Sequence, residues 1–292
     1  MPGPSPEHGA GGTPDSAEIK QALRRLADLP DDDFDLAEAA LMLAALERPR
    51  VSLDRYRHHL RDLTDAVARD ISRRLGDLAT LDARAAALIA VITGEHGYHG
   101  DDLTYDDLQN ANLMRVIDRR KGLPVALGIL YIHAARAQGW TAFGLNFPGH
   151  FLIALEAESA RVILDPFSGH RLDGASALRA FLKAVAGDDA ELSPQHCAPL
   201  GNRAVLLRLQ NNIKARLAGQ GRSARAAAVL DGMLLFAPAE VDLWREAGAL
   251  HAQAGNLSAA MAALDHYLTV SRDPVARHGA AQLLQSLRQR LN

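Results

Sequence analysis

The sequence predicts an α+β protein with a small antiparallel sheet among many helices. Three features predict this class. Apolar residues recur at three- and four-residue intervals through most of residues 16–93, which indicates amphipathic helices. Two short apolar runs near the middle of the chain indicate neighbouring strands. The last third repeats itself at an offset of 34 residues, as between Leu209 and Leu243, with helical spacing in each copy.

Composition limits the class of function. The chain has 292 residues, of which 48% are hydrophobic and 23% charged, so it can bury a substantial core and hold more than one domain. Its net charge of -3 gives no general electrostatic reason to bind nucleic acid or an anionic membrane. The single cysteine, Cys197, excludes an intramolecular disulfide and a Cys-rich zinc site, which fits a reducing cytoplasm.

Residues 1–15 are rich in Pro and Gly, and we expect them to form a disordered tail. They lack the positive start and the apolar core of a signal peptide. No run in the chain approaches the roughly 18 apolar residues that a membrane-spanning helix needs. We therefore expect a cytoplasmic protein with no membrane partner.

Residues 16–93 are expected to form a helical N-terminal region. A short amphipathic helix starts at Ser16, and Phe34 to Leu46 is apolar almost all round, which indicates a buried helix. Asp54 can cap a third helix, whose apolar residues keep the same spacing. An alanine-rich helix from Leu81 to Thr93 completes the region.

The loop that follows, residues 94–102, contains two histidines and two aspartates, so a metal site has to be weighed. His96, His99 and Asp101 offer ligands that suit zinc or manganese. Their spacing matches no established ligand motif, and three glycines mainly indicate a tight turn of the backbone. We interpret the segment as a structural loop without metal, with a metal-dependent activity as a minor alternative.

The central segment places one helix and two strands in order. The helix is predicted from Leu123 to Gln138, the first strand leads into His150, and the second, Val162 to Leu164, ends at Asp165. This order resembles that of papain-like and transglutaminase-like enzymes. In those enzymes a Cys at the helix start attacks a carbonyl, a His takes its proton and an Asp orients the imidazole. The resemblance predicts that His150 and Asp165 lie within hydrogen-bonding reach.

The nucleophile that this resemblance implies is missing. Its position, counted back from the end of the helix, falls at Pro124, with Ala126 as the other candidate, and neither side chain can attack. Cys197 follows the His and the Asp along the chain, so its use would require a different chain order. The pair that is left has two interpretations: a general base for water, or a buried hydrogen bond that holds two strands in register.

The C-terminal third contains two copies of a unit with the tetratricopeptide period. The offset pairs Gly221 with Gly255 at a turn and Ala226 with Ala260, where two helices must approach closely. Each copy therefore predicts a pair of antiparallel helices, and Arg277 to Leu291 predicts a terminal capping helix. A generic helical bundle is the alternative, since two copies are fewer than the usual three.

The chain also resembles a known family. The motifs are Gly94 to Asp101, Asp107 to Leu113, Arg119 to Leu127, Asn146 to Leu152 and Asp165 to Phe167. They are similar to the SirB family of bacterial proteins, which combine a transglutaminase-like core with tetratricopeptide-like helices. The resemblance implies that fold and a cytoplasmic location. The binding residues expected within these motifs are Asn110, Asn146, Arg119 and Arg120.

We therefore divide the chain into a tail (1–15), a helical N-terminal region (16–93), a transglutaminase-like core (94–200) and tetratricopeptide-like helices with a capping helix (201–292). The predicted function is a noncatalytic regulatory module that binds a protein or peptide, with no cofactor and no nucleic acid partner. The missing Cys argues against an active transglutaminase or cysteine protease.

The alternative function is an amidase-like or peptidase-like acyl hydrolase, which would use His150, Asp165 and water. The shape of the cleft bears on both. An open cleft beside Pro124 and His150 would allow binding or catalysis, whereas a closed cleft would disfavour any substrate.

Overall fold

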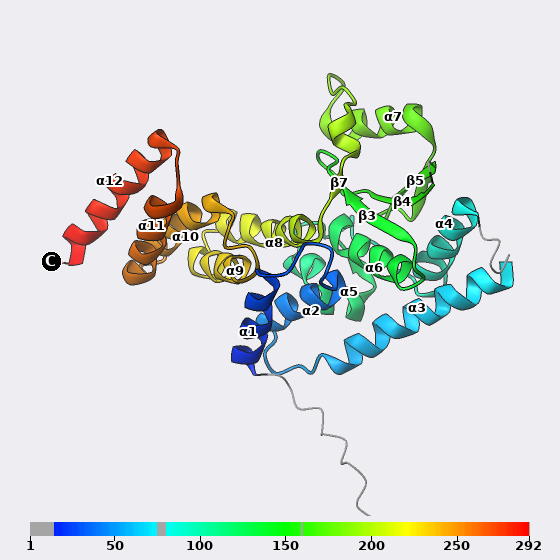
Figure 1. The fold of residues 1–292 in the computed structure, drawn as a ribbon, viewed down its shortest axis with the longest axis horizontal. Helices are drawn as coiled ribbons and strands as arrows, with labels where there is room; N and C mark the ends of the chain where they lie inside the picture. The colour runs from blue at the N-terminus through cyan, green and yellow to red at the C-terminus, as the bar shows by residue number, and fades with distance from the viewer. Residues whose placement is uncertain (1–14, 75–79, 159, 292) are drawn as a thin grey trace, which may run out of the picture.

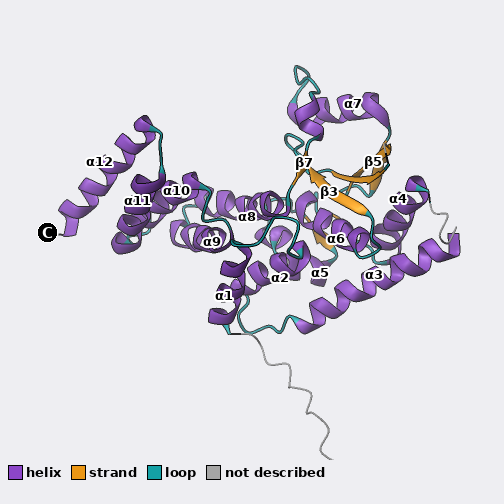
Figure 2. Cartoon of the chain, in the orientation of Figure 1, coloured by secondary structure: helices purple, strands orange, loops and turns teal. Residues whose placement is uncertain are grey.

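A computed structural model describes residues 15–74, 80–158 and 160–291. Its helices pack around a five-stranded main sheet, and an array of C-terminal helices extends away from that body (Figure 1). Figure 2 shows the sheet between α6 and α7, with α8 beside it and α10, α11 and α12 farther away. The tail expected over residues 1–15 lies outside the described residues except for Asp15, which caps the first helix.

The fold opens with helices α1 (Ser16–Leu26), α2 (Leu36–Leu46), α3 (Asp54–Arg74) and α4 (Leu81–Ile89). Asp15, Asp35 and Thr80 cap three of them by accepting hydrogen bonds from N–H groups of the first turn. Most residues of α2 are buried, as its apolar sequence predicts. The structure differs from the expectation after Ile89, where α4 continues as a π-helical turn, Ala90–Glu95.

The main sheet has the strand order β6-β5-β4-β3-β7, and every neighbouring pair is antiparallel. Its strands are β3 (Thr141–Leu145), β4 (Ile153–Ala157), β5 (Ala160–Asp165), β6 (His170–Leu172) and β7 (Pro199–Leu200). Alternate side chains point to opposite faces. Ile153 and Leu164 pack into the main core, and Ala154 and Ile163 pack into a second core.

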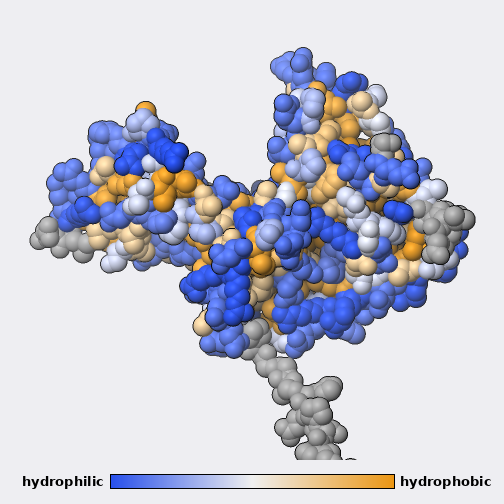
Figure 3. Space-filling model, in the orientation of Figure 1, coloured by the Kyte–Doolittle hydropathy of each residue, from blue (hydrophilic) through white to orange (hydrophobic). Residues whose placement is uncertain are grey.

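Helices cover both faces of this sheet. Helix α6 (Pro124–Arg136) lies in the main core and is buried along most of its length. Helix α7 (Gly174–Ala186) covers the second core with Leu178 and Leu182. Figure 3 shows hydrophobic surface in the region where α7 meets the sheet. The sequence prediction did not include α7.

A short connection precedes α6 and fixes its start. It contains a 3-10 turn (Leu108–Ala111), helix α5 (Leu113–Arg119) and two short parallel strands, β1 (His99–Gly100) and β2 (Lys121–Gly122). Pro124 is the first residue of α6, where its fixed φ suits a helix start. The Leu123 N–H donates to the Asn110 carbonyl at 2.8 Å, which holds the start of α6 against the 3-10 turn.

The C-terminal array contains α8 (Asn202–Gly219), α9 (Ser223–Phe236), α10 (Val241–Gln253), α11 (Leu257–Val270) and α12 (Pro274–Leu291). The predicted helix pairs and the capping helix are confirmed. A Cβ added at Gly248 of α10 would lie 2.5 Å from the Leu264 side chain and 3.4 Å from the Ala260 carbonyl oxygen. Ala260 is fully buried, so the predicted close crossing is present. Among the described residues, no helix is both long and apolar enough to cross a membrane.

Candidate functional site

His150 and Asp165 form a hydrogen-bonded pair at one end of the main sheet. His150 Nε2 lies 2.8 Å from Asp165 Oδ1, which confirms the predicted contact. The two side chains are 12% and 5% exposed. Asp165 is the last residue of β5, as predicted. His150 lies in the turn between β3 and β4 and not on a strand, and the antiparallel pairing of β4 with β5 brings that turn to Asp165.

The Asp165 carboxylate accepts hydrogen bonds at both oxygens. Oδ1 also accepts from the Phe167 N–H at 3.0 Å, and Oδ2 accepts from the Ser168 hydroxyl at 2.6 Å. Burial by itself raises the pKa of Asp165, but the hydrogen bonds from His150 and Ser168 outweigh burial and hold that pKa below its ordinary value. The carboxylate is therefore charged at neutral pH and selects Nε2 as the protonated nitrogen of the neutral imidazole.

The backbone around His150 is held from two sides. Gly149 has a φ of +71°, and a Cβ there would lie 3.1 Å from the Val185 carbonyl oxygen of α7, so only glycine fits without strain. Arg208 of α8 donates to the carbonyl oxygens of Phe147, at 3.0 Å, and of His150. Helices α7 and α8 therefore position the imidazole.

Pro124 lies beside His150, where the sequence places the missing nucleophile. Both residues line a cavity of about 60 Å³, which is small against the roughly 300–1,000 Å³ of ligand pockets. Ala126 is fully buried and does not line this cavity. The other lining residues are Tyr105, Leu123, Val125, Gly149, Phe151, Arg208 and Asn212.

Contacts between α8 and the loop at residues 101–107 close the cleft. The guanidinium of Arg216 lies 5.4 Å from the centre of the Tyr105 ring and donates to the Tyr105 carbonyl at 3.4 Å. Its Nε also lies 3.2 Å from Asp106 Oδ1. This closed arrangement disfavours a bulky substrate at His150.

The pair can supply a general base but no nucleophile. Within the described residues, His150 Nδ1 has no hydrogen-bond partner, so it is available as an acceptor when Nε2 carries the proton. Cys197 packs against the second core, and no described hydrogen bond or ring contact joins it to His150. Activation of a water molecule is the chemistry that these groups allow.

Two of the expected binding residues lie in an internal network. Asn110 is fully buried; its amide donates to the Thr104 carbonyl at 2.7 Å and accepts from Arg119 at 2.8 Å. Arg119 also pairs with buried Asp101 at 2.7 Å. Burial acts to raise the pKa of Asp101, but hydrogen bonds from Thr104 and Arg119 lower it to about 2. The network joins the 101–110 loop to the end of α5.

The other two expected binding residues lie apart from it. Arg120 has a φ of 60° at the end of α5, and its guanidinium contacts the His59 ring and the Tyr98 hydroxyl. Asn146 is the exposed one of the four, and its backbone N–H donates to the Ala198 carbonyl at 3.0 Å. The structure does not bring these four residues together with His150.

The three residues weighed as metal ligands, His96, His99 and Asp101, do not form a ligand set among the described residues. His96 Nε2 is buried without a hydrogen-bond partner, His99 is exposed, and Asp101 is paired with Arg119. In the described ranges, no three His, Cys, Asp or Glu side chains converge as metal ligands would.

Sequence reasoning missed the residues that close the cleft. Arg208 and Asn212 come from α8, and Tyr105 comes from the loop before the 3-10 turn. The sequence did indicate that Arg208 and Asn212 share one helix face, because they are four residues apart. Nothing in the sequence indicated that this face would turn towards His150.

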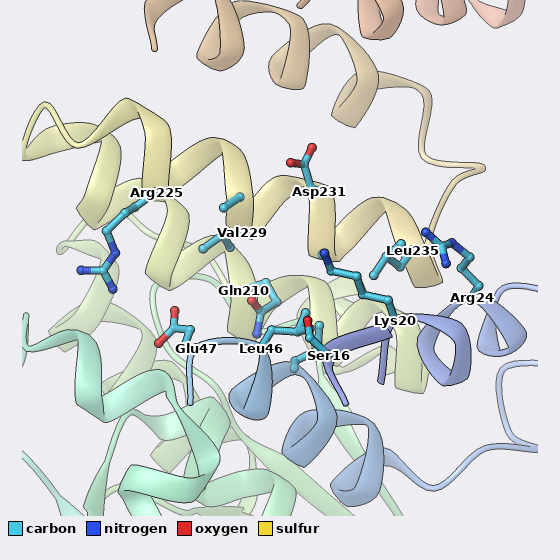
Figure 4. Close-up of a pocket in the computed structure, with 13 residues that line it drawn as sticks. Ser16, Lys20, Arg24, Leu46, Glu47, Gln210, Arg225, Val229, Asp231 and Leu235 are labelled. Atoms are coloured by element: carbon cyan, nitrogen blue, oxygen red, sulfur yellow. The ribbon is translucent and has the colours of Figure 1, made fainter. Parts of the chain in front are cut away.

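A much larger cavity lies away from His150. It has a volume of about 640 Å³ and opens between α1, α2, α8 and α9 (Figure 4). Apolar, cationic and acidic side chains line it together. The sequence did not predict this cavity, because its walls come from residues 16–47 and 210–235, which lie far apart in the chain.

The fold and the His–Asp pair define a class of protein that comparison with known families also finds. Residues 54–211 match the model of the transglutaminase-like superfamily, and this range contains α6, His150 and Asp165. Residues 213–291 match a tetratricopeptide repeat model. The class is thus a transglutaminase-like core joined to tetratricopeptide helices.

Relatives of known name place the chain within this class. It is 30% identical to a UPF0162 protein of Xylella fastidiosa (strain Temecula1) over 83% of this chain and 86% of that protein. It is 30% identical to a UPF0162 protein of Vibrio cholerae over 78% and 84% of the two chains. It is 23% identical to Protein SirB1 of Salmonella typhimurium over 89% and 96%. The chain belongs to the SirB1 and UPF0162 family of transglutaminase-like proteins, which confirms the resemblance in its motifs.

Proposed function

We propose that this chain is a noncatalytic, cytoplasmic transglutaminase-like protein that binds a protein or peptide and serves a regulatory role. The observation that carries the proposal is Pro124 at the start of α6 beside the His150–Asp165 pair. A proline side chain has no atom that can attack a carbonyl. Loss of the nucleophile from a catalytic triad removes most of its rate advantage.

Two further observations support binding over catalysis. The cleft at His150 holds about 60 Å³ and is closed by Tyr105 and α8, whereas the cavity at α1 and α9 holds about 640 Å³. The second volume lies in the usual range for a ligand pocket. Tetratricopeptide helices commonly present surfaces to partner proteins, and this chain has such helices.

Hydrolysis by activated water is the second candidate function. It is favoured by Nδ1 of His150, which has no hydrogen-bond partner among the described residues, and by the cavity at that ring, which has room for a few water molecules. In this mechanism, the imidazole would take a proton from water while the charged Asp165 stabilises the imidazolium.

Turnover of amide and ester substrates separates the two functions. We expect no turnover by the wild-type protein or by His150→Ala, measured with chromogenic anilide and nitrophenyl ester substrates. His170→Ala is the matched control, because His170 is exposed on β6. Wild-type turnover that His150→Ala abolishes and His170→Ala preserves would establish the hydrolase and refute the noncatalytic proposal.

A Pro124→Cys variant adds a gain-of-function arm to this experiment. The new thiol would lie at a helix N-terminus beside His150, and both features favour the reactive thiolate. A small alkylating reagent such as iodoacetamide should therefore modify residue 124 faster than Cys197 in the same molecule. Adding His150→Ala should slow modification at residue 124. Equal rates with and without His150 would show that the imidazole does not activate this position.

A further inference from the structure

The large cavity at α1 and α9 forms a groove, here called the α1–α9 groove. Its apolar lining comprises Leu43 and Leu46 of α2 and Ala228, Val229 and Leu235 of α9. Ser16, Lys20 and Arg24 of α1 border these side chains, as Figure 4 shows in part. Residues of α1 and α2 lie outside both family matches, which begin at residues 54 and 213. The groove is therefore not a feature of either matched family region alone.

In the groove, the acidic side chains have partners within the chain, whereas the cationic side chains do not form ion pairs among the described residues. Asp231 pairs with His251 at 2.9 Å, and Glu47 accepts a hydrogen bond from the Asn112 amide at 3.3 Å. In the part of the chain that the structure describes, Lys20, Arg24 and Arg225 have no ion-pair or side-chain hydrogen-bond partner. The groove therefore leaves positive charge available to a partner.

Besides the cationic side chains, Gln210 is an independent indication that the groove binds a ligand. It is a polar residue of α8 that is 6% exposed and lines the groove. Its side-chain amide has no hydrogen-bond partner among the described residues. Figure 4 places Gln210 on the groove wall between α9 and the end of α2. An amide both donates and accepts, so it can pair with the N–H and C=O of a peptide backbone.

We propose that the α1–α9 groove binds an acidic peptide segment of a partner protein, a site that rests on the proposed binding function and specifies its ligand. Carboxylates of the segment would pair with Lys20, Arg24 and Arg225. Its backbone would pair with the Gln210 amide, and its apolar side chains would cover Leu46 and Val229. Gln210 is largely buried, but its amide atoms are not among the fully buried polar atoms that lack a partner, so they are accessible from the groove to a peptide backbone.

The test measures binding of defined peptides to the full chain by fluorescence anisotropy. The probe is a fluorescein-labelled peptide in which Glu and Leu alternate, and the comparison peptide has Lys in place of Glu. We expect the Glu peptide to bind and the Lys peptide to bind at least about tenfold more weakly, because like charges would meet in the groove.

Two variants locate this binding in the groove. Arg225→Glu should weaken binding of the Glu peptide about fivefold or more, and the new Glu suits the first turn of α9. Arg179→Glu, an exposed position on α7, is the matched charge control and should change nothing. Gln210→Leu keeps the size of the side chain and should weaken binding about tenfold, because the peptide loses its amide partner. Circular dichroism checks that each variant is folded.

Three outcomes would overturn this inference. One is failure of the Glu peptide to bind, or equal binding of the two peptides. Another is binding that Arg225→Glu and Gln210→Leu leave unchanged. The third is binding that appears only after residues 1–14 are deleted, which would make this chain's own N-terminal segment the occupant. The noncatalytic proposal is judged separately by substrate turnover, so it can survive any of them.

Discussion

At the scale of single residues, the surroundings of the half-buried imidazole of His59 keep it neutral. His59 Nε2 accepts a hydrogen bond from the Arg120 guanidinium and lies 2.7 Å from the Tyr98 hydroxyl oxygen. The His96 ring lies with its centre 5.6 Å away. Burial, Arg120 and His96 together lower the pKa of His59 to about 4. This site is distinct from His150 and is a structural one.

The lowered pKa of His59 predicts a pH-dependent stability. The ordinary pKa is 6.5, so the unfolded chain binds more protons than the folded chain between about pH 6.5 and 4. The contribution of neutral His59 to the free energy of unfolding is therefore fully present above this pH range and is lost as pH falls through it. The free energy of unfolding of His59→Gln should therefore fall by about 1–2 kcal/mol less than that of the wild type over this pH range, after allowance for solvent screening.

Urea unfolding of the wild type and the variant, near neutral pH and near the lower end of that window, measures the effect. His58→Gln is the matched control, because His58 is the preceding residue of α3 and its side chain is 69% exposed. An equal loss of stability in wild type and His59→Gln would refute the role given to His59.

The helices were the most predictable elements, because their apolar spacing is local. The helices of the repeat begin and end near the turns at Gly221 and Gly255, as the offset of 34 residues indicates. The sheet was predicted only in part. Its central strands have apolar runs, but β7 and the β1–β2 pair are two residues long each and carry no periodic signal.

Overpacking one helix crossing tests the repeat at this scale. Ala260→Leu should lower the free energy of unfolding by about 1–3 kcal/mol, because Gly248 and Ala260 bring α10 and α11 too close for a larger side chain. Ala259→Leu is the matched control, since Ala259 is exposed on the same helix. Urea unfolding measures both, and an unchanged Ala260→Leu protein would contradict the close crossing.

At the scale of the whole molecule, Arg203 joins the N-terminal helices to the C-terminal array. This residue of α8 pairs with Asp31 at 3.0 Å and donates to the carbonyl oxygens of Leu26, at 2.6 Å, and Phe236, at 2.9 Å. The partners lie at the end of α1, in the following loop and at the end of α9. One side chain thus satisfies groups from three segments.

Removing this junction should weaken the whole fold. We expect Arg203→Ala to lower the free energy of unfolding by about 2–3 kcal/mol, because it leaves carbonyl groups and Asp31 without their charged donor. Arg288→Ala removes an exposed ion pair with Asp265 and should change it by less than about 1 kcal/mol. Thermal unfolding followed by circular dichroism compares the two, and equal effects would show that Arg203 is not a junction.

The sequence by itself determined most of the helices, the repeat and the family, because each is encoded by spacing or by motifs within a short segment, but it did not indicate α7. It also determined the His150–Asp165 contact, since antiparallel strands in that order bring their ends together. Only the tertiary structure decided that α8 closes the cleft beside Pro124 and that α1 and α9 form a groove around Gln210. Those features depend on packing between segments far apart in the chain. The local spacing of apolar residues does not indicate which helix faces will pack together.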